Sequence, residues 1–406
     1  MLLKLSDNTF FVQGFKNGAI YDLKNEKVYS INEIACSIIL KLFKNETEFT
    51  DVELKFIEQL HTKKLLNKCE VKEFCPNIQT SKKEIKKINL AWLEITQSCN
   101  LKCVHCYEGA THVSASNTLN IDDWINIIDE LKTLNVSNVV VIGGEPCCYK
   151  NLLMILEYLK EAHIKTTIIT NATLINDRLK KFLIENTDLF SVKVSIYGPN
   201  ALIHEAVTRV QGSFNKMLTN VSYLVANNVK VKAAVIAMKE NEDYLKETKA
   251  FIEKLGVQYN RFDVIRNVFG GIQNAHIPTR SDVVNSSKYM RPNFAINKKR
   301  FINNFYQNSC WYGKIVITET GEVLPCVFER DISLGNVKSN SILEILNSKK
   351  LKKCWYFPLD NVEICKDCEF RYACKDCRPL GKSVSGNIHA KNPRCQYNPY
   401  KGVWNE

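Results

Sequence analysis

From Asn89 to about Gly271, short apolar runs alternate with amphipathic stretches, and this alternation constrains the fold of the 406-residue chain more than any other feature. The runs are NLAWLEI, NVVVIGG, TTIIT, SVKVSIYG, KVKAAVIA and RFDVIR, separated by stretches such as INIIDELKTL. Apolar strands that alternate with helices pair in parallel, because each crossover helix must pack back onto the sheet. We therefore predict an α/β fold in which six strand-helix units form a partial, TIM-like barrel.

A cysteine-rich loop, CNLKCVHCYE, follows the first of these strands and contains Cys99, Cys103 and Cys106. In parallel sheets, functional loops lie beyond the carboxyl ends of the strands. A cubane iron-sulfur cluster takes four cysteine ligands, so three thiolates leave one iron open to a small molecule. A structural zinc loop is the alternative, although zinc sites are usually built from paired C-x2-C knuckles or added histidines.

The spacing of this loop, three residues and then two, resembles the signature of the radical S-adenosylmethionine (SAM) enzymes. The resemblance implies a 4Fe-4S cluster on Cys99, Cys103 and Cys106, whose open iron chelates the amino and carboxylate groups of SAM. It also implies reductive cleavage of SAM to a 5'-deoxyadenosyl radical that removes hydrogen from a substrate carbon. An electron donor such as flavodoxin or ferredoxin would supply the electron.

The second motif, GGEP, closes the strand NVVVI and contains Gly143, Gly144 and Glu145. Two glycines let a ligand approach the backbone closely, and a neighbouring carboxylate can accept hydrogen bonds from an ammonium group. A tight turn is the alternative. The resemblance assigns Glu145 to the methionyl ammonium of SAM. It also implies cofactor contacts by residues that could equally pack or cap helices, namely His105, Tyr107, Asn171, Ser195 and Arg209.

The tail from Cys310 is dense in cysteines and resembles the SPASM extension of peptide-modifying radical SAM enzymes, which holds two auxiliary cubane clusters. The resemblance implies one cluster on Cys310, Cys326 and Cys377, and another on Cys365, Cys368, Cys374 and Cys395. The first set lacks one ligand, for which Cys354 or a substrate thiolate is a candidate. Only two residues separate Cys374 from Cys377 where the commonest pattern has three, and a zinc ribbon is the alternative.

Residues 1–80 begin with strand-like runs, including AIYDL and KVYSI, and then switch to helical periodicity. One helix is predicted over Asn32 to Leu42, and a second opens with a capping box from Thr50 to Glu53 and buries Leu54, Ile57 and Leu60. This order suggests a winged helix. It resembles the element of peptide maturases that captures a leader peptide by strand addition. A DNA-binding winged helix is the alternative, but LKFIEQLHTKKLL offers chiefly lysine for base contacts.

Taken together, the motifs resemble the SPASM-domain maturases of ribosomally made peptides, including the grasp-with-SPASM type. The predicted domains are a leader-recognition winged helix (1–80), a radical SAM partial barrel (81–300) and an iron-sulfur domain (301–406). The implied function is a cysteine thioether crosslink to a carbon of a precursor peptide. Carbon-carbon crosslinking, epimerisation and formylglycine formation on a sulfatase are alternatives, and an iron-sulfur DNA-binding redox regulator is an alternative of another class.

Composition narrows the partners and the compartment. The formal charge is +12, but no arginine-rich block of the kind that tracks a phosphate backbone is present, so no nucleic acid partner is expected. Lys4 and Asp7 interrupt the apolar core that a signal peptide would need, and no membrane partner is expected. We predict a cytoplasmic protein. Its sixteen cysteines then indicate metal ligation rather than disulfides.

Overall fold

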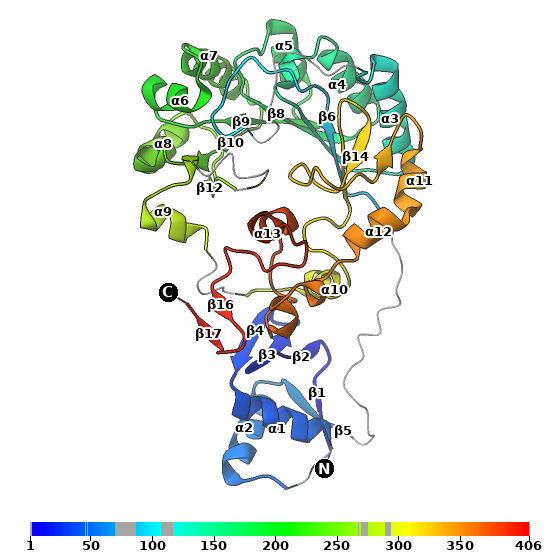
Figure 1. The fold of residues 1–406 in the computed structure, drawn as a ribbon, viewed down its shortest axis with the longest axis vertical. Helices are drawn as coiled ribbons and strands as arrows, with labels where there is room; N and C mark the ends of the chain where they lie inside the picture. Colours follow the sequence, from blue (N-terminus) through cyan, green and yellow to red (C-terminus); the bar gives the residue numbers. More distant parts are fainter. Residues whose placement is uncertain are drawn as a thin grey trace. The chain divides into compact units, whose positions relative to one another are not determined.

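The chain forms two units, each built from segments that are far apart in the sequence. The computed structural model describes residues 2–44, 46, 48–69, 87–106, 117–266, 268, 275–288 and 294–405. The first unit combines residues 1–85, 288–312 and 355–406, and the second combines residues 86–287 and 313–354. Figure 1 labels the helices and strands of both units.

The second unit is built on an eight-stranded sheet with the order β10-β9-β8-β7-β6-β13-β14-β15. From β10 to β13 all neighbours are parallel, whereas β14 and β15 are antiparallel additions. The strands are β6 (Leu90–Glu94), β7 (Asn138–Ile142), β8 (Lys165–Thr170), β9 (Phe190–Ser195), β10 (Val231–Ala234), β13 (Lys314–Ile317), β14 (Glu322–Leu324) and β15 (Gly335–Asn336). A separate parallel pair joins β11 (Ile236–Ala237) to β12 (Asp263–Val264).

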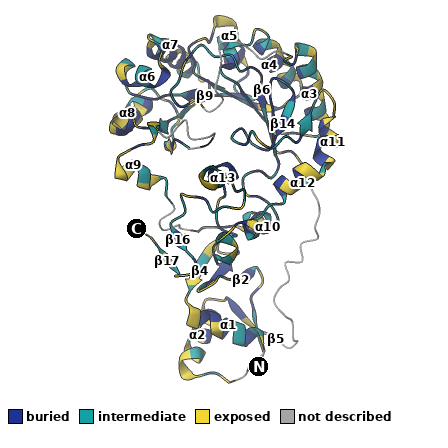
Figure 2. Cartoon of the chain, in the orientation of Figure 1, coloured by how far each residue is buried: buried dark blue, intermediate teal, exposed yellow. Residues whose placement is uncertain are grey.

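The helices of this unit are α3 (Ile121–Thr133), α4 (Leu152–Glu161), α5 (Asp177–Glu185), α6 (Ala201–Thr208), α7 (Ser213–Ala226), α8 (Leu245–Lys254), α9 (Ser281–Ser286) and α11 (Ile342–Asn347), and α12 (Lys349–Trp355) ends at the unit boundary. Of these, α3 to α8 lie along the outer side of the sheet (Figure 1). Each crossover helix buries an apolar stripe, as α3 does with Trp124, Ile127 and Leu131. Figure 2 accordingly shows exposed residues along the outer surfaces of these helices.

The first unit contains the N-terminal segment and most of the cysteine-rich tail. Its antiparallel sheet has the order β2-β3-β4, and β1 pairs with β5. The N-terminal elements are β1 (Leu2–Leu5), β2 (Thr9–Gln13), β3 (Gly18–Asp22), β4 (Lys27–Ile31), α1 (Glu33–Phe43), α2 (Asp51–Thr62) and β5 (Leu66–Cys69). The tail adds α10 (Lys298–Tyr306), α13 (Arg378–Ser385), β16 (Tyr397–Asn398) and β17 (Val403–Trp404).

A shared hydrophobic core joins the N-terminal sheet to the tail of this unit. Tyr21 of β3 and Phe301 of α10 are fully buried and pack with their ring centroids 4.9 Å apart. Phe370 and Tyr397, from the tail, belong to the same core. Residues more than 270 positions later in the chain cover part of the apolar surface of the N-terminal sheet. The core of this sheet is therefore completed by the tail.

The fold predictions are confirmed at the level of an α/β fold with a largely parallel sheet. Both N-terminal helices are present, with Asn32 capping α1 and the Thr50 to Glu53 capping box opening α2. The predicted burial of Leu54 is wrong, since this side chain is 50% exposed while Ile57 and Leu60 are buried. The winged-helix assignment and the count of six barrel units stay predictions. Within the described residues, every helix is too short or too polar to traverse a bilayer.

Candidate cofactor and cluster sites

The loop after β6 brings the three predicted cluster cysteines to one cavity. Cys99, Cys103 and Cys106 line a cavity of about 400 Å³ at the carboxyl ends of β6 to β9. Backbone bonds hold this loop to the end of α6, because the Lys102 and Val104 amides donate to the last carbonyls of that helix, each at 3.0 Å. The volume lies within the range of about 300–1,000 Å³ usual for small-molecule sites.

Two glycines of the GGEP motif line the same cavity and fit against the loop after β6. A Cβ on Gly143 would lie 2.2 Å from the Thr96 carbonyl oxygen, and one on Gly144 would lie 2.4 Å from the Gln97 carbonyl oxygen. The Gly144 amide donates to the Thr96 carbonyl at 2.7 Å. Glycine is therefore needed here for close approach of two backbone segments, in addition to any approach by a ligand.

Glu145 is fully buried and does not line the cavity. Its carboxylate accepts hydrogen bonds from the Thr170 hydroxyl at 2.6 Å, the Asn171 amide at 2.7 Å and the Cys147 amide at 3.1 Å. Burial raises the pKa of this carboxyl, and these bonds oppose the rise. Glu145 thus ties the loop after β7 to the end of β8, while its predicted contact with an ammonium group stays a prediction.

An aromatic wall completes the cavity. His105 packs edge-on against Tyr197, with ring centroids 4.9 Å apart, and both side chains are buried. Burial, with a smaller contribution from His276, lowers the pKa of His105 to about 4, so its imidazole is neutral at physiological pH. Tyr197 was missed by the sequence reasoning, although it stands two residues beyond Ser195 at the carboxyl end of β9.

The remaining predicted cofactor contacts divide into three groups. Asn171 and Ser195 line the cavity, and the Asn171 side chain donates to Asn100 at 3.0 Å. Arg209 is exposed, does not line the cavity and caps α6 in the left-handed conformation with φ 57°. Tyr107 lies outside the described residues. The cofactor roles of all these residues stay predictions.

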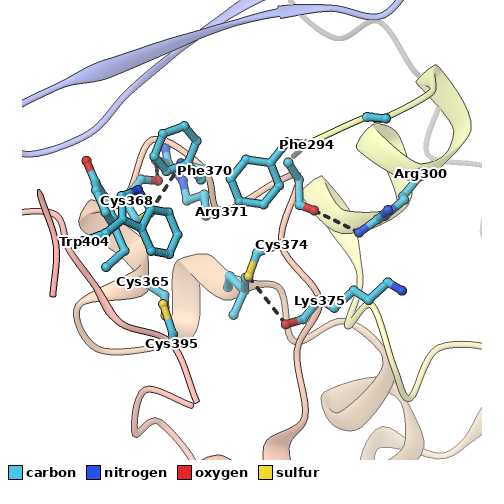
Figure 3. A pocket seen from close by; sticks show the side chains of 14 residues that line it. Phe294, Arg300, Cys365, Cys368, Phe370, Arg371, Cys374, Lys375, Cys395 and Trp404 are labelled. Carbon is cyan, nitrogen blue, oxygen red and sulfur yellow. Dashed lines mark hydrogen bonds between the residues drawn. The ribbon is translucent and has the colours of Figure 1, made fainter. Parts of the chain in front are cut away.

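A second cavity, of about 270 Å³, lies within the first unit and is lined by four predicted ligands of one auxiliary cluster (Figure 3). They are Cys365, Cys368, Cys374 and Cys395, which the sequence spreads over 31 positions. Phe370, Arg371, Tyr397 and Trp404 complete part of the wall, and among the described residues no carboxylate lines the cavity. Four thiol donors that line one cavity match the donor set of a cubane cluster.

Three of the predicted ligands each accept the same kind of local hydrogen bond. The backbone amide two residues downstream donates to the sulfur at 3.4 Å in each case, from Leu101 to Cys99, from Phe328 to Cys326 and from Phe370 to Cys368. Amide donors of this kind stabilise thiolates and tune iron-sulfur clusters. Among the described residues no three His, Cys, Asp or Glu side chains are grouped closely enough for a single metal ion. The fit to clusters therefore rests on the sulfur-lined cavities and these amide donors.

The other auxiliary ligand set is divided between the units. Cys310 and Cys377 belong to the first unit, where the Asp376 amide donates to the Ser309 hydroxyl at 2.9 Å and so brings their two segments together. Cys326 belongs to the second unit, as does buried Cys354. Glu329 lies near both of these cysteines. Its backbone amide donates to the Cys326 carbonyl. Burial, with a smaller contribution from the Glu329 carboxylate, raises the pKa of Cys354 to about 11.

Comparison with known proteins agrees with this arrangement of sites. Residues 93–252 match the radical SAM superfamily, and residues 309–369 match SPASM, an iron-sulfur cluster-binding domain. The chain thus contains a radical SAM domain followed by a SPASM domain. The sequence-based assignment to radical SAM enzymes with a SPASM domain is confirmed. A radical SAM enzyme requires SAM and a 4Fe-4S cluster, and its SPASM domain binds auxiliary clusters.

The names of relatives of this radical SAM enzyme denote different functions. The antilisterial bacteriocin subtilosin biosynthesis protein AlbA of Bacillus subtilis is 27% identical over 320 residues, which cover 74% of this chain and 69% of AlbA. An AdoMet-dependent heme synthase of Oleidesulfovibrio alaskensis is 23% identical over 343 residues, which cover 77% of this chain and 88% of the synthase.

A solved structure shares the fold over nearly the whole chain. Streptococcus suis SuiB, bound to precursor peptide SuiA, superimposes with a TM-score of 0.61 at 17% identity, covering 98% of this radical SAM enzyme and all of SuiB. At this identity the likeness shows a common fold. It includes the N-terminal segment, which lies outside both matched families.

Proposed function

We propose that this radical SAM enzyme modifies a ribosomally synthesised precursor peptide, forming a thioether between a cysteine sulfur and a peptide carbon. The observation that carries the proposal is the cavity lined by Cys99, Cys103 and Cys106 together with Gly143 and Gly144. Similarity to AlbA and to the SuiB fold supports a peptide as the substrate class. When a cluster and SAM are bound there, they supply hydrogen-atom abstraction by a 5'-deoxyadenosyl radical.

The chain's own residues position the cofactor and limit access to it. Three cysteines from one loop leave room for a fourth, non-protein ligand on a cubane cluster. The Asn171 side chain, braced by Asn100, and Ser195 line the cavity and can donate hydrogen bonds to a cofactor. The rings of His105 and Tyr197 form a buried aromatic wall on one side of the cavity.

The N-terminal sheet is the proposed site of leader recognition. β4 is an edge strand of the order β2-β3-β4, so its outer backbone groups are not used within this sheet. A leader peptide can pair with such an edge by strand addition. This rests on the proposed winged-helix identity of residues 1–80, followed by a radical SAM barrel over 81–300 and a SPASM domain over 301–406.

We also propose three 4Fe-4S clusters and a small electron-transfer protein, such as flavodoxin or ferredoxin, as the electron donor. The four-cysteine cavity supports one auxiliary cluster, held by Cys365, Cys368, Cys374 and Cys395. The proposed ligands of the other are Cys310, Cys326 and Cys377, with Cys354 or a substrate thiolate as the fourth ligand. A cytoplasmic setting fits this requirement for reduced iron-sulfur clusters.

The first test is turnover of SAM. Anaerobically reconstituted protein, incubated with dithionite and SAM, should release 5'-deoxyadenosine, and the variant with alanine at Cys99, Cys103 and Cys106 should not. An iron-sulfur regulator without enzymatic activity would release none in either form. Failure of the reconstituted wild-type protein to cleave SAM would overturn the proposal.

The second test identifies the product. A cysteine-bearing peptide encoded beside this gene should lose two hydrogens in mass and resist thiol alkylation at the linked cysteine. Loss of two hydrogens with the thiol still alkylatable would indicate a carbon-carbon link, and an unchanged mass together with a D-residue found after hydrolysis would indicate epimerisation. A porphyrin substrate serves as a parallel assay because one relative is named a heme synthase.

A further inference from the structure

The hairpin formed by β2 and β3 binds the backbone on both sides of Cys368. The Phe15 amide, at the hairpin turn, donates to the Asp367 carbonyl at 2.8 Å. The Tyr21 hydroxyl, on β3, donates to the Glu369 carbonyl at 2.8 Å, and this bond is fully buried. A proposed cluster ligand is thus flanked by two residues whose carbonyls are each bound by the N-terminal sheet.

Arg371 joins the same hairpin to Cys368 itself. One guanidinium nitrogen, Nη1, donates to the Cys368 carbonyl at 2.8 Å and to the Gln13 carbonyl of β2 at 3.1 Å. A second nitrogen, Nε, donates to Asp360 at 3.0 Å. Figure 3 shows Arg371 beside Cys368 at the cavity that the four cysteines line. The planar fork of arginine can hold these three acceptors at once, whereas a lysine ammonium on a flexible stem fixes their geometry poorly.

Gly14, at the end of β2, lets the hairpin approach this closely. A Cβ at this position would lie 2.6 Å from the Glu369 carboxylate and 2.9 Å from the Glu369 backbone nitrogen. Glu369 is fully buried, and its other carboxylate oxygen accepts a hydrogen bond from the Tyr397 hydroxyl. A methyl group would therefore push the turn and the Cys368 segment apart.

We propose that the β2–β3 hairpin is a structural part of the auxiliary cluster site, in which Gly14, Tyr21 and Arg371 are positioning residues for Cys368. The inference rests on the proposed ligand set of Cys365, Cys368, Cys374 and Cys395. Residues that orient a metal ligand through hydrogen bonds set its geometry and affinity. The sheet proposed to bind the leader peptide is thus the same sheet that fixes a cluster ligand.

The test isolates the auxiliary clusters by working in the variant with alanine at Cys99, Cys103 and Cys106. In this background we compare Tyr21→Phe, Arg371→Lys and Gly14→Ala, measuring iron per chain, the rate of iron loss to a chelator and the EPR spectrum after reduction. Each change should speed iron loss from one cluster by about 10-fold or more, as expected when a supporting bond to a ligand is lost. The EPR signal of that cluster should shift.

Lys16→Ala is the matched control, because Lys16 is an exposed residue of the same hairpin turn. It should leave the iron content, the chelation rate and the spectrum unchanged. Tyr21→Phe removes one hydroxyl and keeps the buried ring, so it decides the test if Gly14→Ala does not fold. Chelation rates and spectra of Tyr21→Phe and Arg371→Lys equal to those of Lys16→Ala would overturn the inference.

A ligand variant separates this inference from the proposed cluster. Replacing both Cys365 and Cys368 by alanine in the same background should remove one cluster's iron. If that variant keeps all its iron, the proposed ligand set is wrong and the inference falls with it. If it loses iron while the hairpin variants behave like Lys16→Ala, the ligand set stands and only the role of the hairpin is refuted.

Discussion

At the scale of single residues, Glu145 illustrates how a motif residue can lie next to a cavity without lining it. The resemblance to radical SAM enzymes assigns this carboxylate to an ammonium group, because it stands beside two glycines that let a ligand approach the backbone closely. In the structure both carboxylate oxygens accept bonds from the loops after β7 and at the end of β8. Thr170 and Asn171 reach Glu145 because β7 pairs with β8, which brings together residues about 25 positions apart. The four-residue motif contains no information about this pairing.

Glu145→Gln is expected to loosen the cavity wall. Glutamine keeps one acceptor oxygen and replaces the other by an NH2 group. That NH2 group would face the Thr170 hydroxyl or the Asn171 amide, which now donates to the carboxylate. Loss of one such buried bond costs about 1–3 kcal/mol, so thermal unfolding should move down and SAM binding should weaken. Exposed Glu157→Gln on α4 is the control, and equal effects of the two changes on SAM affinity would contradict the role of Glu145 in the site.

A buried histidine should make stability depend on pH. Burial lowers the pKa of His204 from 6.5 to about 4, so the unfolded chain takes up a proton more readily than the folded protein. Stability is unaffected by this group above pH 6.5 and falls as the pH drops from 6.5 toward 4, by up to about 3 kcal/mol. His204→Gln should flatten this fall in unfolding experiments across that pH range.

The control for His204 is exposed His163, whose replacement by glutamine should leave the pH dependence unchanged. Acid also acts on the iron-sulfur clusters, so the measured quantity is the difference between each variant and the wild type at every pH. Parallel curves for the wild type and His204→Gln would contradict the assignment.

At the scale of elements, a buried ion pair fixes the segment that carries Cys377. Arg378 and Asp376 are both buried and joined by two bonds of 2.5 Å, and Arg378 also donates to the carbonyls of Ile388 and Ala390. Asp376 in turn accepts a bond from Asn308 at 3.1 Å, two residues before Cys310. This network joins the end of the tail's cysteine run to the start of α13 and to the segment after α10.

Arg378→Met should destabilise the first unit strongly, because it leaves Asp376 buried without its cation. Removing one partner of a buried pair costs about 3–5 kcal/mol, which denaturant unfolding monitored by circular dichroism can measure. Arg178→Met on the exposed face of α5 is the matched control and should have little effect. A loss below about 1 kcal/mol for Arg378→Met would show that the pair adds little to stability.

The same scale shows the limit of helical periodicity. The spacing of Leu54, Ile57 and Leu60 predicts one buried stripe on α2, yet Leu54 is 50% exposed. The capping box that begins this helix is present as predicted, because it depends on residues only three positions apart. The width of the buried stripe on α2 depends on the elements that pack against this helix, which include α1 and β5.

At the scale of the whole molecule, the tail enters both units. β13 comes from the region predicted as an iron-sulfur domain. It nevertheless pairs in parallel with β6, which is the strand that precedes the cysteine loop. The segments on either side of residues 313–354 belong to the other unit. A linear division of the sequence does not reveal this interleaving, because the short apolar run KIVI carries no mark of its partner.

The three proposed clusters imply a definite metal content. Fully reconstituted protein should contain about 12 iron atoms per chain, and the variant with alanine at Cys99, Cys103 and Cys106 about 8, since each cubane has four irons. Elemental analysis with protein quantitation checks both values. Zinc in place of iron would contradict the clusters, and about 8 irons in the wild type would leave one auxiliary site without a cluster.

Local sequence determined the parallel strands β6 to β10, the capped starts of α1 and α2, the glycines of the GGEP turn and the spacing of the first three cysteines, because each depends on residues a few positions apart. Only the tertiary structure decided that Glu145 lies behind the cavity, that Tyr197 joins its wall, that Cys395 meets Cys365 and that the N-terminal hairpin binds the Cys368 segment. Those contacts join remote segments, and they arise from packing of whole elements rather than from any short pattern.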